Sequence, residues 1–294
     1  MITILGTTGN TGRRIAEQLL AKGEKVRAVA RNKEKAKDLA AKGAEVLVGN
    51  IDDAKFLASA FKGADAIYTL IPPNAAAPDF GAYQDELGTA IATAITDSGV
   101  TKVVFLSSLG GDQTSGTGPI LGAHRQEKRL RELGVDVLIL RPTYFMENVG
   151  GNLGMIKHQG INGGAVLPDV KMPFIASQDI ADFATKALLA RDWKGIEVRE
   201  LLGPRDYTMA EITTILGAKI GKADLKYVPF PYPDFAKALT GFGFSQSVAD
   251  GYADMSKAFN EGRVKSLEGR SARNTTPTTF ENFADGLAKA YASV

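Results

Sequence analysis

The 294-residue chain contains no cysteine and only two histidines, His124 and His158. The absence of cysteine excludes disulfide bonds and thiolate chemistry, and it is typical of proteins that work in a reducing compartment. A zinc site with two histidines would need carboxylate ligands as well, so we expect no metal. The first residues show no signal-peptide pattern, and no apolar run approaches the roughly 20 residues that a membrane span requires. We therefore expect a cytoplasmic protein with no membrane partner.

The chain also lacks an excess of charge of either sign. Lysine and arginine number 35 against 33 aspartates and glutamates, which leaves a formal net charge of +2. Proteins that bind nucleic acid usually concentrate positive charge on one face, so this balance favours a small-molecule partner and no direct contact with nucleic acid. The sequence fits a monomer or a homodimer, because the long helix predicted near residues 83–96 could pair two subunits or cover a sheet.

Short apolar runs alternate with helical patterns through the first half of the chain. The apolar runs are rich in Val, Ile and Leu on both faces, as strands of a covered parallel sheet are. They predict strands at Ile2–Leu5, Val26–Ala30, Val46–Val48, Ala66–Leu70, Val103–Leu106 and Val137–Leu140. Between them, helices are predicted at Arg13–Ala21, Lys33–Lys42, Ala54–Phe61, Tyr83–Thr96 and Ala123–Leu133. This repetition predicts an α/β fold with a doubly wound, Rossmann-type parallel sheet.

The alternation ends after Pro142. Residues 151–174 are rich in glycine and proline and are predicted to be irregular, and helices resume at Asp179–Ala190, Met209–Lys219 and Phe280–Tyr291. Two pairs have the spacing of capping boxes, namely Thr208 with Glu211 and Thr278 with Glu281. We predict a Rossmann domain over residues 1–150 and a smaller, mixed C-terminal substrate lobe over residues 151–294. The two are interleaved, because part of 160–205 is expected to complete the sheet.

A glycine-rich loop, "GTTGNTG", follows the first predicted strand and precedes the first predicted helix. Glycines allow a sharp turn and a close approach to a pyrophosphate, while the free N–H groups and the dipole of the helix attract the anion. In this strand–turn–helix context the spacing predicts a dinucleotide site, although a turn without a ligand is the alternative. The residues expected to bind the dinucleotide are Gly6, Thr8, Gly9, Asn10, Thr11 and Gly12.

The second predicted strand ends at Arg31, with Lys35 close behind it. A site for NAD usually places an acidic residue here to bind the ribose hydroxyls, and none is present. A guanidinium with a nearby ammonium suits a 2′-phosphate instead, so we expect NADP(H) in preference to NAD(H). Lys35 could equally belong to the solvated face of an amphipathic helix.

Further cofactor contacts are expected where the next two strands end. The residues after the third strand could border the adenine, although Asp52 or the adjacent Asp53 could instead cap the following helix. The loop after the fourth strand contains two prolines and should run beside the ribose and the pyrophosphate. The two sets are Asn50, Ile51 and Asp52, followed by Leu70, Ile71 and Pro72.

Five stretches together resemble a known family. They are "ILGTTGNTG", "VRAVARN", "SSLGG", "GAHRQEKRLRELGVDV" and "LRPTYFMENV". The chain is similar in them to the NmrA-like family of atypical short-chain dehydrogenases/reductases, and most of all to bacterial NADPH-dependent members that reduce quinones or azo dyes. The resemblance covers the first 150 residues well and the remainder loosely. It implies a Rossmann fold, NADPH binding, and a substrate cleft between the sheet edge and the C-terminal lobe.

The catalytic pattern departs from that of ordinary short-chain dehydrogenases, which use a Tyr-x-x-x-Lys helix. No tyrosine of this chain has a lysine four residues later, and the corresponding helix contains His124 and Lys128 instead. Both would project from one helix face, where His124 could donate a proton and Lys128 could hold the nicotinamide ribose. The alternative is an ordinary solvated surface. Ser107 and Ser108, after the fifth strand, could place a hydroxyl near the substrate or simply form a turn.

Aromatic residues follow the sixth strand and return near residue 230. We expect Pro142, Thr143, Tyr144 and Phe145 to contact the nicotinamide end of the cofactor. Aromatic walls suit a flat quinone or azo substrate, although such clusters often pack in a core. Glu147 and Asn148 could orient the carboxamide or cap the next helix. The stretch "VPFPYPDF", with Phe230, Tyr232 and Phe235, is predicted to be a rigid loop that forms a lid or a wall of the substrate site. The residues expected to contact substrate are Tyr144, Met146, Asn148, Phe230 and Tyr232.

The leading functional hypothesis is an NADPH-dependent oxidoreductase that transfers hydride to a planar electrophile such as a quinone or an azo compound. The first alternative is a non-catalytic, NADP(H)-sensing regulatory protein of the NmrA type, since the same fold supports both roles. A further alternative is an isoflavone-reductase-like NADPH reductase that recruits Lys128.

Overall fold

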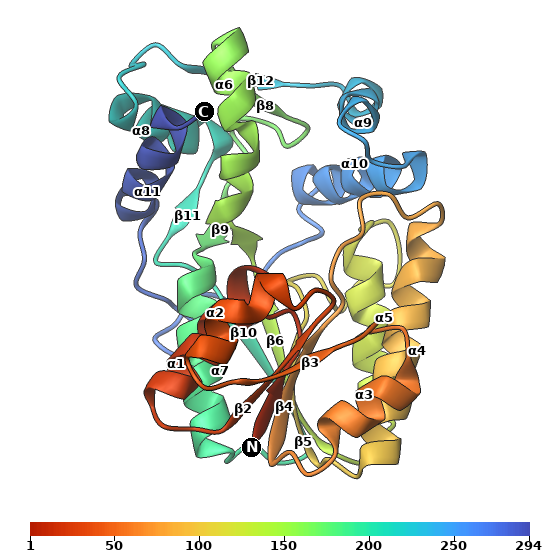
Figure 1. Cartoon of the computed structure of the whole chain (residues 1–294). Coiled ribbons are helices and arrows are strands. Elements are labelled where there is room, and N and C mark those ends of the chain that lie inside the picture. The colour runs from red at the N-terminus through yellow and green to blue at the C-terminus, as the bar shows by residue number, and fades with distance from the viewer.

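A computed structural model describes all 294 residues and shows an α/β body beneath a smaller lobe (Figure 1). A seven-stranded sheet forms the centre of the body, and all of its strand pairs are parallel. The predicted doubly wound, Rossmann-type sheet is therefore confirmed. Its strands, in spatial order, are β10 (Ile196–Leu201), β6 (Asp136–Pro142), β5 (Lys102–Leu106), β4 (Ala66–Leu70), β1 (Ile2–Ile4), β2 (Val26–Ala30) and β3 (Glu45–Val48).

The strand order reverses between β1 and β4. The chain winds outward through β2 and β3, then crosses back to build β4, β5 and β6 on the other side of β1. In open parallel sheets, ligands bind at the carboxyl ends of the strands beside such a switch point. The loops that follow β1, β2, β4, β5 and β6 therefore form the edge where a ligand is expected.

Helices cover both faces of the sheet. Two hydrophobic clusters, of 21 and 15 buried residues, lie on its opposite faces, which explains why the strands are apolar on both sides. One face is covered by α1 (Asn10–Ala21) and α7 (Ser177–Ala190), and the other by α3 (Ala54–Phe61), α4 (Phe80–Ser98) and α5 (Ile120–Arg131).

Some helix boundaries differ from the prediction. The predicted helix over 33–42 is a short 3₁₀ turn, η1 (Glu34–Ala36), followed by α2 (Lys37–Ala41). Helix α4 begins at Phe80 rather than Tyr83, because the Asp79 carboxylate accepts a hydrogen bond from Ala82 N at 2.9 Å and caps the helix.

The prediction of an irregular segment over 151–174 is wrong. This part of the chain contains the end of a 3₁₀ helix, a short helix and two strands. Leu153 and Ile156 anchor the helix in the hydrophobic core of the lobe, and Gly160 ends it in the left-handed conformation with φ 72°. The elements are η2 (Met146–Asn152), α6 (Leu153–Gln159), β8 (Ile161–Gly164) and β9 (Met172–Ile175).

The stretch "VPFPYPDF" is not a loop either. Its first part belongs to β12 (Lys226–Pro229), which pairs in parallel with β8. Its second part begins α9 (Tyr232–Gly241), where a proline stands in the first turn and needs no N–H partner. Prolines therefore mark the end of a strand and the start of a helix here.

The upper lobe has its own core of 22 buried hydrophobic residues, including Phe174, Tyr207 and Phe280. Strand β9 lies between β7 (Tyr144–Phe145) and β11 (Asp206–Tyr207). Figure 1 shows α9 and α10 as a hairpin above the α4 and α5 side of the body. The remaining helices of the lobe are α8 (Met209–Lys219), α10 (Gln246–Asn260) and α11 (Phe280–Ala292).

One of the two predicted capping boxes is present. Thr208 caps α8: its hydroxyl accepts from Glu211 N at 3.1 Å, and Glu211 in turn accepts from Thr208 N at 2.7 Å. The box predicted at Thr278 and Glu281 is wrong, because Thr279 is the capping residue of α11. Thr278 instead donates its hydroxyl to buried Asp179 at 2.6 Å, which ties the start of α11 to α7.

The C-terminal half of the chain contributes to both parts of the molecule. Strand β10 completes the sheet beside β6, and α7 packs on α1, while the segments before and after them build the upper lobe. None of the helices combines the length and the apolar character needed to cross a membrane.

A buried ion pair joins α5 to β6. The Glu127 carboxylate accepts two hydrogen bonds from the Arg141 guanidinium, at 2.8 Å and 2.6 Å. The two side chains are only 3% and 9% exposed. Although burial opposes it, the Glu127 carboxylate raises the pKa of Arg141. Ser107 donates its hydroxyl to the same carboxylate at 2.6 Å, which extends the network to the end of β5.

We expect Glu127→Ala to lower the free energy of unfolding by about 3–5 kcal/mol, because it leaves the buried Arg141 charge without hydrogen bonds to a carboxylate and with only Asp112, at 3.7 Å, as an ionic partner. Urea denaturation followed by circular dichroism measures this loss. Arg131→Ala is the matched control, since Arg131 is 41% exposed and 3.5 Å from the same carboxylate. An exposed pair of this kind contributes about 0–1 kcal/mol. Equal losses in the two variants would contradict a structural role for the Glu127–Arg141 pair.

Candidate functional site

The glycine loop after β1 is a tight turn in which two glycines have no room for a side chain. Gly6 has φ 68°, and a Cβ there would lie 2.6 Å from Leu70 Cδ2. A Cβ on Gly12 would lie 2.6 Å from the carbonyl oxygen of Gly6 and about as close to that of Leu5. Gly9 N donates to Gly6 O at 2.9 Å and closes the turn. The glycines therefore let α1 start directly above the end of β1.

The first turn of α1 is open to an anion. Its capping residue, Gly9, offers no side-chain acceptor, and the first turn contains no acidic residue. Thr8, Gly9 and Asn10 are exposed. The N–H groups of this turn are thus available, and a pyrophosphate fits them in charge and position. Thr11 is different: it is buried and its hydroxyl accepts from Tyr68 at 2.9 Å, so only its backbone could reach a ligand.

Arg31 lies directly after β2, at the same edge of the sheet. Its side chain is exposed and makes no ion pair or hydrogen bond within the protein, in contrast to Arg13 and Lys37, which pair with Asp38 and Glu34. Lys35 is also exposed. A free guanidinium with a free ammonium nearby retains its full capacity to bind a phosphate.

The loops after β3 and β4 approach the same edge. Asp53 caps α3, accepting from Lys55 N at 2.9 Å and Phe56 N at 3.0 Å, so Asp52 stays exposed beside Asn50 and Ile51. The Tyr83 hydroxyl donates to Pro72 O at 3.0 Å and fixes the Leu70–Pro72 loop. Burial raises the pKa of Tyr83, while the Arg31 guanidinium opposes this rise and Asp52 adds to it. Arg31 and Asp52 are therefore close neighbours of this loop.

The hydroxyl groups after β5 and β6 are engaged inside the protein. Ser107 is buried and donates to Glu127, and Ser108 donates to Leu109 O at 3.0 Å. Thr143 donates to Pro173 O at 2.7 Å, and Pro142 O accepts from Leu109 N at 2.8 Å. These hydrogen bonds fix the two loops against each other, so the loops offer a rigid wall at the edge of the sheet.

His124 and Lys128 lie on α5 in different surroundings. His124 is half-buried, and its Nδ1 lies 2.9 Å from Gly111 O. Because a carbonyl oxygen can only accept, Nδ1 carries the proton, and Nε2 is the atom left for a ligand. Lys128 is exposed and forms no ion pair. Sequence reasoning missed buried Glu127 between them, although an arginine in the apolar strand "VLILRP" signals a buried partner.

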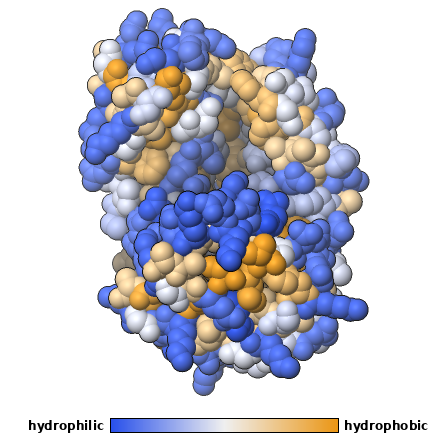
Figure 2. Space-filling model, in the orientation of Figure 1, coloured by the Kyte–Doolittle hydropathy of each residue, from blue (hydrophilic) through white to orange (hydrophobic).

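A cavity of about 770 Å³ opens between the two sides of the upper lobe, above the sheet edge. Figure 2 shows it as a hollow with apolar residues on its walls. It is lined by 27 residues, of which 16 are hydrophobic, from β7, η2, α6 and β8 on one side and from the β12–α9 segment and α10 on the other. This volume and this polarity are typical of small-molecule sites.

Of the five residues expected to contact substrate, the cavity brings together Tyr144, Asn148 and Phe230. Met146 does not line it: this side chain is fully buried in the lobe core, because η2 turns it inward. Tyr232 does not line it either, and its hydroxyl accepts from Asn260 Nδ2 at 2.9 Å. His124, Lys128 and Ser107 also lie outside the cavity wall.

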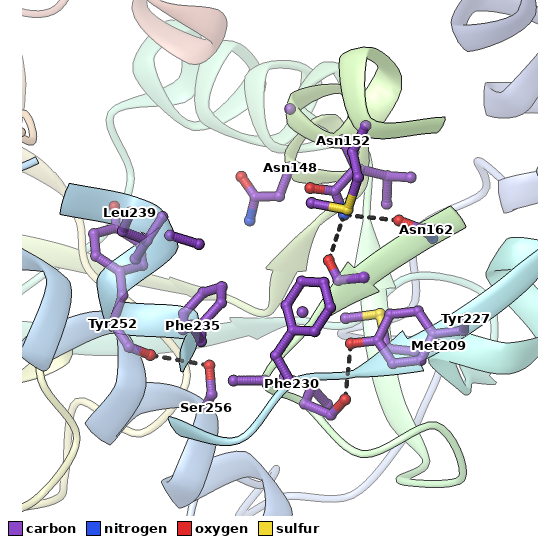
Figure 3. A pocket seen from close by; sticks show the side chains of 18 of the residues that line it. Asn148, Asn152, Asn162, Met209, Tyr227, Phe230, Phe235, Leu239, Tyr252 and Ser256 are labelled. Carbon is purple, nitrogen blue, oxygen red and sulfur yellow. Dashed lines mark hydrogen bonds between the residues drawn. The ribbon is translucent and has the colours of Figure 1, made fainter. Parts of the chain in front are cut away.

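On the α9–α10 side of the wall, only Phe235 was predicted, as part of the candidate lid or substrate wall in "VPFPYPDF". Figure 3 shows side chains from this hairpin facing Asn148 across the open space. They come from residues about a hundred positions later in the chain, and only the aromatic content of "VPFPYPDF" hinted at them. The side chains are Phe235, Leu239, Phe242, Phe244, Tyr252, Met255 and Phe259.

Glu147 and Tyr144 complete the side of the cavity nearest the sheet. The Glu147 carboxylate accepts from Ser177 N at 3.0 Å, so it caps the first turn of α7, a helix later in the chain than the next one that it was expected to cap. Tyr144 packs against Phe174 and Phe259, with ring centroids 5.1 Å and 6.0 Å away. Burial raises the pKa of Tyr144 to about 12, so its hydroxyl stays neutral.

Two curated relatives match the chain over most of their length. The NAD(P)H azoreductase of Xenophilus azovorans is 27% identical over 300 residues, covering 99% of each chain. Quinone oxidoreductase 2 of Escherichia coli is 29% identical over 266 residues, covering 89% of each.

Solved structures agree with this relationship. The NADPH complex of the E. coli quinone oxidoreductase QOR2 superposes with a TM-score of 0.82 at 25% identity, covering 98% of this chain and 99% of that one. Triphenylmethane reductase of Citrobacter sp., in complex with NADP(H), shares the fold with a TM-score of 0.81 at 20% identity, covering 98% and 100%. The sequence profile of the NmrA-like family matches residues 1–284. The chain belongs to the NmrA-like family.

Proposed function

We propose that the chain is an NAD(P)H-dependent reductase that prefers NADPH and reduces a planar electrophile such as a quinone or an azo compound. One observation carries the proposal: the glycine loop follows β1 at the same edge of the sheet at which Tyr144 follows β6, and Tyr144 lines the apolar cavity. The names of the relatives support it, since they describe azo and quinone reductases that use NAD(P)H.

The geometry of the sheet supports a dinucleotide laid along this edge. Four strand intervals separate β2, which ends at Arg31, from β6, which leads to Tyr144. At about 4.8 Å for each interval, the distance is roughly 19 Å, which an extended dinucleotide spans. The first turn of α1 lies between the two ends, where the pyrophosphate would be.

The proposed cofactor contacts follow the edge of the sheet from the end of β2 to the end of β6. Arg31 and Lys35 bind the 2′-phosphate, the glycine loop and the first turn of α1 bind the pyrophosphate, and Lys128 reaches the nicotinamide ribose. The other contacts proposed along the edge are Asn50, Ile51, Asp52, Leu70, Ile71, Pro72, Ser107, Ser108, Pro142, Thr143, Tyr144 and Phe145. When bound, the reduced nicotinamide supplies a hydride.

The protein's own contribution is mainly to position the acceptor. Tyr144 and Phe230 offer flat walls to an aromatic ring, and the Asn148 amide can donate to a carbonyl or azo group. Protonated His124 can donate through Nε2, the nitrogen that Gly111 leaves free. The acceptor thus gains a hydride and a proton, while the cofactor is oxidised. A quinone needs little acid assistance, which makes the absence of a catalytic tyrosine tolerable.

We expect the purified protein to consume NADPH in the presence of a quinone or an azo dye and not with simple aldehydes, because the cavity is apolar and aromatic. The near-ultraviolet absorbance of NADPH measures the rate. Tight NADPH binding by calorimetry without consumption by any acceptor would contradict the reductase and favour an NADP(H)-sensing regulator.

We expect Arg31→Asp to weaken NADPH binding by about 10- to 100-fold, since a hydrogen bond to a charged group contributes about 1.5–3 kcal/mol. NADH binding should change less than about threefold, because NADH lacks the 2′-phosphate. Calorimetric titration with each cofactor measures both. Lys22→Asp, an equal change of charge at the far end of α1, is the control. Equal losses for both cofactors would show that Arg31 does not read the 2′-phosphate.

We expect His124→Gln to lower kcat for azo reduction by about 100-fold, because the reduced nitrogens need a proton donor. Quinone reduction should fall less than about fivefold, since the hydroquinone oxygens can take protons from water. If both reactions keep their rates, His124 is not the proton donor.

A further inference from the structure

The charge of the cavity wall restricts which acceptor it can hold. None of the 27 lining residues is a lysine or an arginine. The single carboxylate, Glu147, is already bound by the N–H of Ser177 at the start of α7. The one basic side chain in the wall is that of His158, which is exposed at the end of α6. A sulfonate, carboxylate or phosphate on the acceptor would lose its hydration in this cavity and find no lysine or arginine to pair with there.

Several polar side chains of the wall are engaged in hydrogen bonds within the protein. Asn152 Nδ2 donates to Asn162 Oδ1 at 2.7 Å and to Gly163 O at 3.0 Å, as Figure 3 shows. Tyr227 donates its hydroxyl to Val166 O at 2.8 Å. These groups therefore present little unpaired polarity to a ligand, whereas exposed Asn148 and Gln159 are the amides left for one.

Three tyrosines of the wall lie in surroundings of low polarity. Burial raises the pKa of Tyr144, of Tyr227 and of Tyr252, which come from β7, β12 and α10. A negatively charged oxygen is thus disfavoured at three separate points around the cavity.

The size of the cavity depends on one aromatic ring. The Cζ end of the Phe230 ring rests on β8 at Gly163, because Gly163 has no side chain: a Cβ there would lie 2.8 Å from Phe230 Cε2 and closer still to Cζ. The Phe230 N–H donates to Gly164 O at 2.8 Å and fixes the residue on this strand. Phe230 lines the cavity together with Phe235 and Leu239, and the volume of about 770 Å³ suits a ligand larger than one ring.

We propose that this site selects uncharged acceptors with two or more rings, fused or linked, of which at least one is aromatic, and that the Phe230 ring, seated on Gly163, sets this selectivity. The proposal rests on the reductase function proposed above, and it adds the class of substrate and the residue pair that selects it. Anionic dyes and phosphorylated compounds are excluded by the wall.

A pair of redox-inert probes tests the selectivity without turnover. N-phenyl-1-naphthylamine and 1-anilinonaphthalene-8-sulfonate share one skeleton and differ by the sulfonate. Fluorescence titration of the full-length protein, saturated with NADPH, should show at least about tenfold tighter binding of the uncharged probe. Equal or tighter binding of the sulfonate would overturn the proposal.

Variants test the role of the ring. Gly163→Ala should weaken binding of the uncharged probe by about tenfold or more, because the added methyl pushes Phe230 into the cavity. Gly286→Ala, in α11 with open space around its Cβ, is the control and should bind as the wild type does. In a Phe230→Leu background, adding Gly163→Ala should weaken binding of the uncharged probe by less than about threefold. If Gly163→Ala weakens binding there as much as it does in the wild type, Phe230 does not transmit the effect. Thermal unfolding verifies that each variant is folded.

Turnover separates this proposal from the proposed function. With NADPH, kcat/KM should be at least about tenfold higher for 1,2-naphthoquinone than for 1,2-naphthoquinone-4-sulfonate, although the sulfonate makes the ring more electrophilic. If both are reduced equally well, the reductase function stands and the selectivity is wrong. If neither they nor any other acceptor is reduced while the probes still discriminate, the proposed function is wrong and the binding preference stands.

Discussion

The packing of α1 onto the end of β1 is the constraint on which the rest of the site depends. Gly12 meets the carbonyls of Leu5 and Gly6 at a distance that no side chain tolerates, so the helix starts directly above the strand. Its free N–H groups then point along the edge where β2, β4, β5 and β6 also end. An anion bound at the first turn of α1 would therefore lie between Arg31, which is cationic and follows β2, and Tyr144, which follows β6 beside the apolar cavity.

The body of the fold could be predicted because its signals are local. Strands apolar on both faces, glycines at helix ends and a glycine loop in a strand–turn–helix context each depend on a few neighbouring residues. The same holds for Arg31, whose position is fixed by the end of β2. The alternative between Asp52 and Asp53 needed the structure, because two adjacent carboxylates can both cap a helix, and only the geometry shows that Asp53 does.

The upper lobe could not be predicted to the same degree, because its elements depend on partners distant in the chain. Glycine-rich "INGG" looks like a loop, yet it forms β8, since β12 pairs with it and the ring of Phe230 needs the space above Gly163. Met146 and Tyr144 are two residues apart and equally apolar in pattern, but the turn into η2 sends one to the core and the other to the cavity. Local sequence does not encode that choice.

The position of β10 at the edge of the sheet has a consequence for how the chain folds. This strand lies beside β6 but follows it by more than fifty residues, which build part of the upper lobe first. Until residue 201 has left the ribosome, β6 remains an unprotected apolar edge. The nucleotide-binding body is therefore not an autonomous early folding unit, and the two parts acquire their final form together.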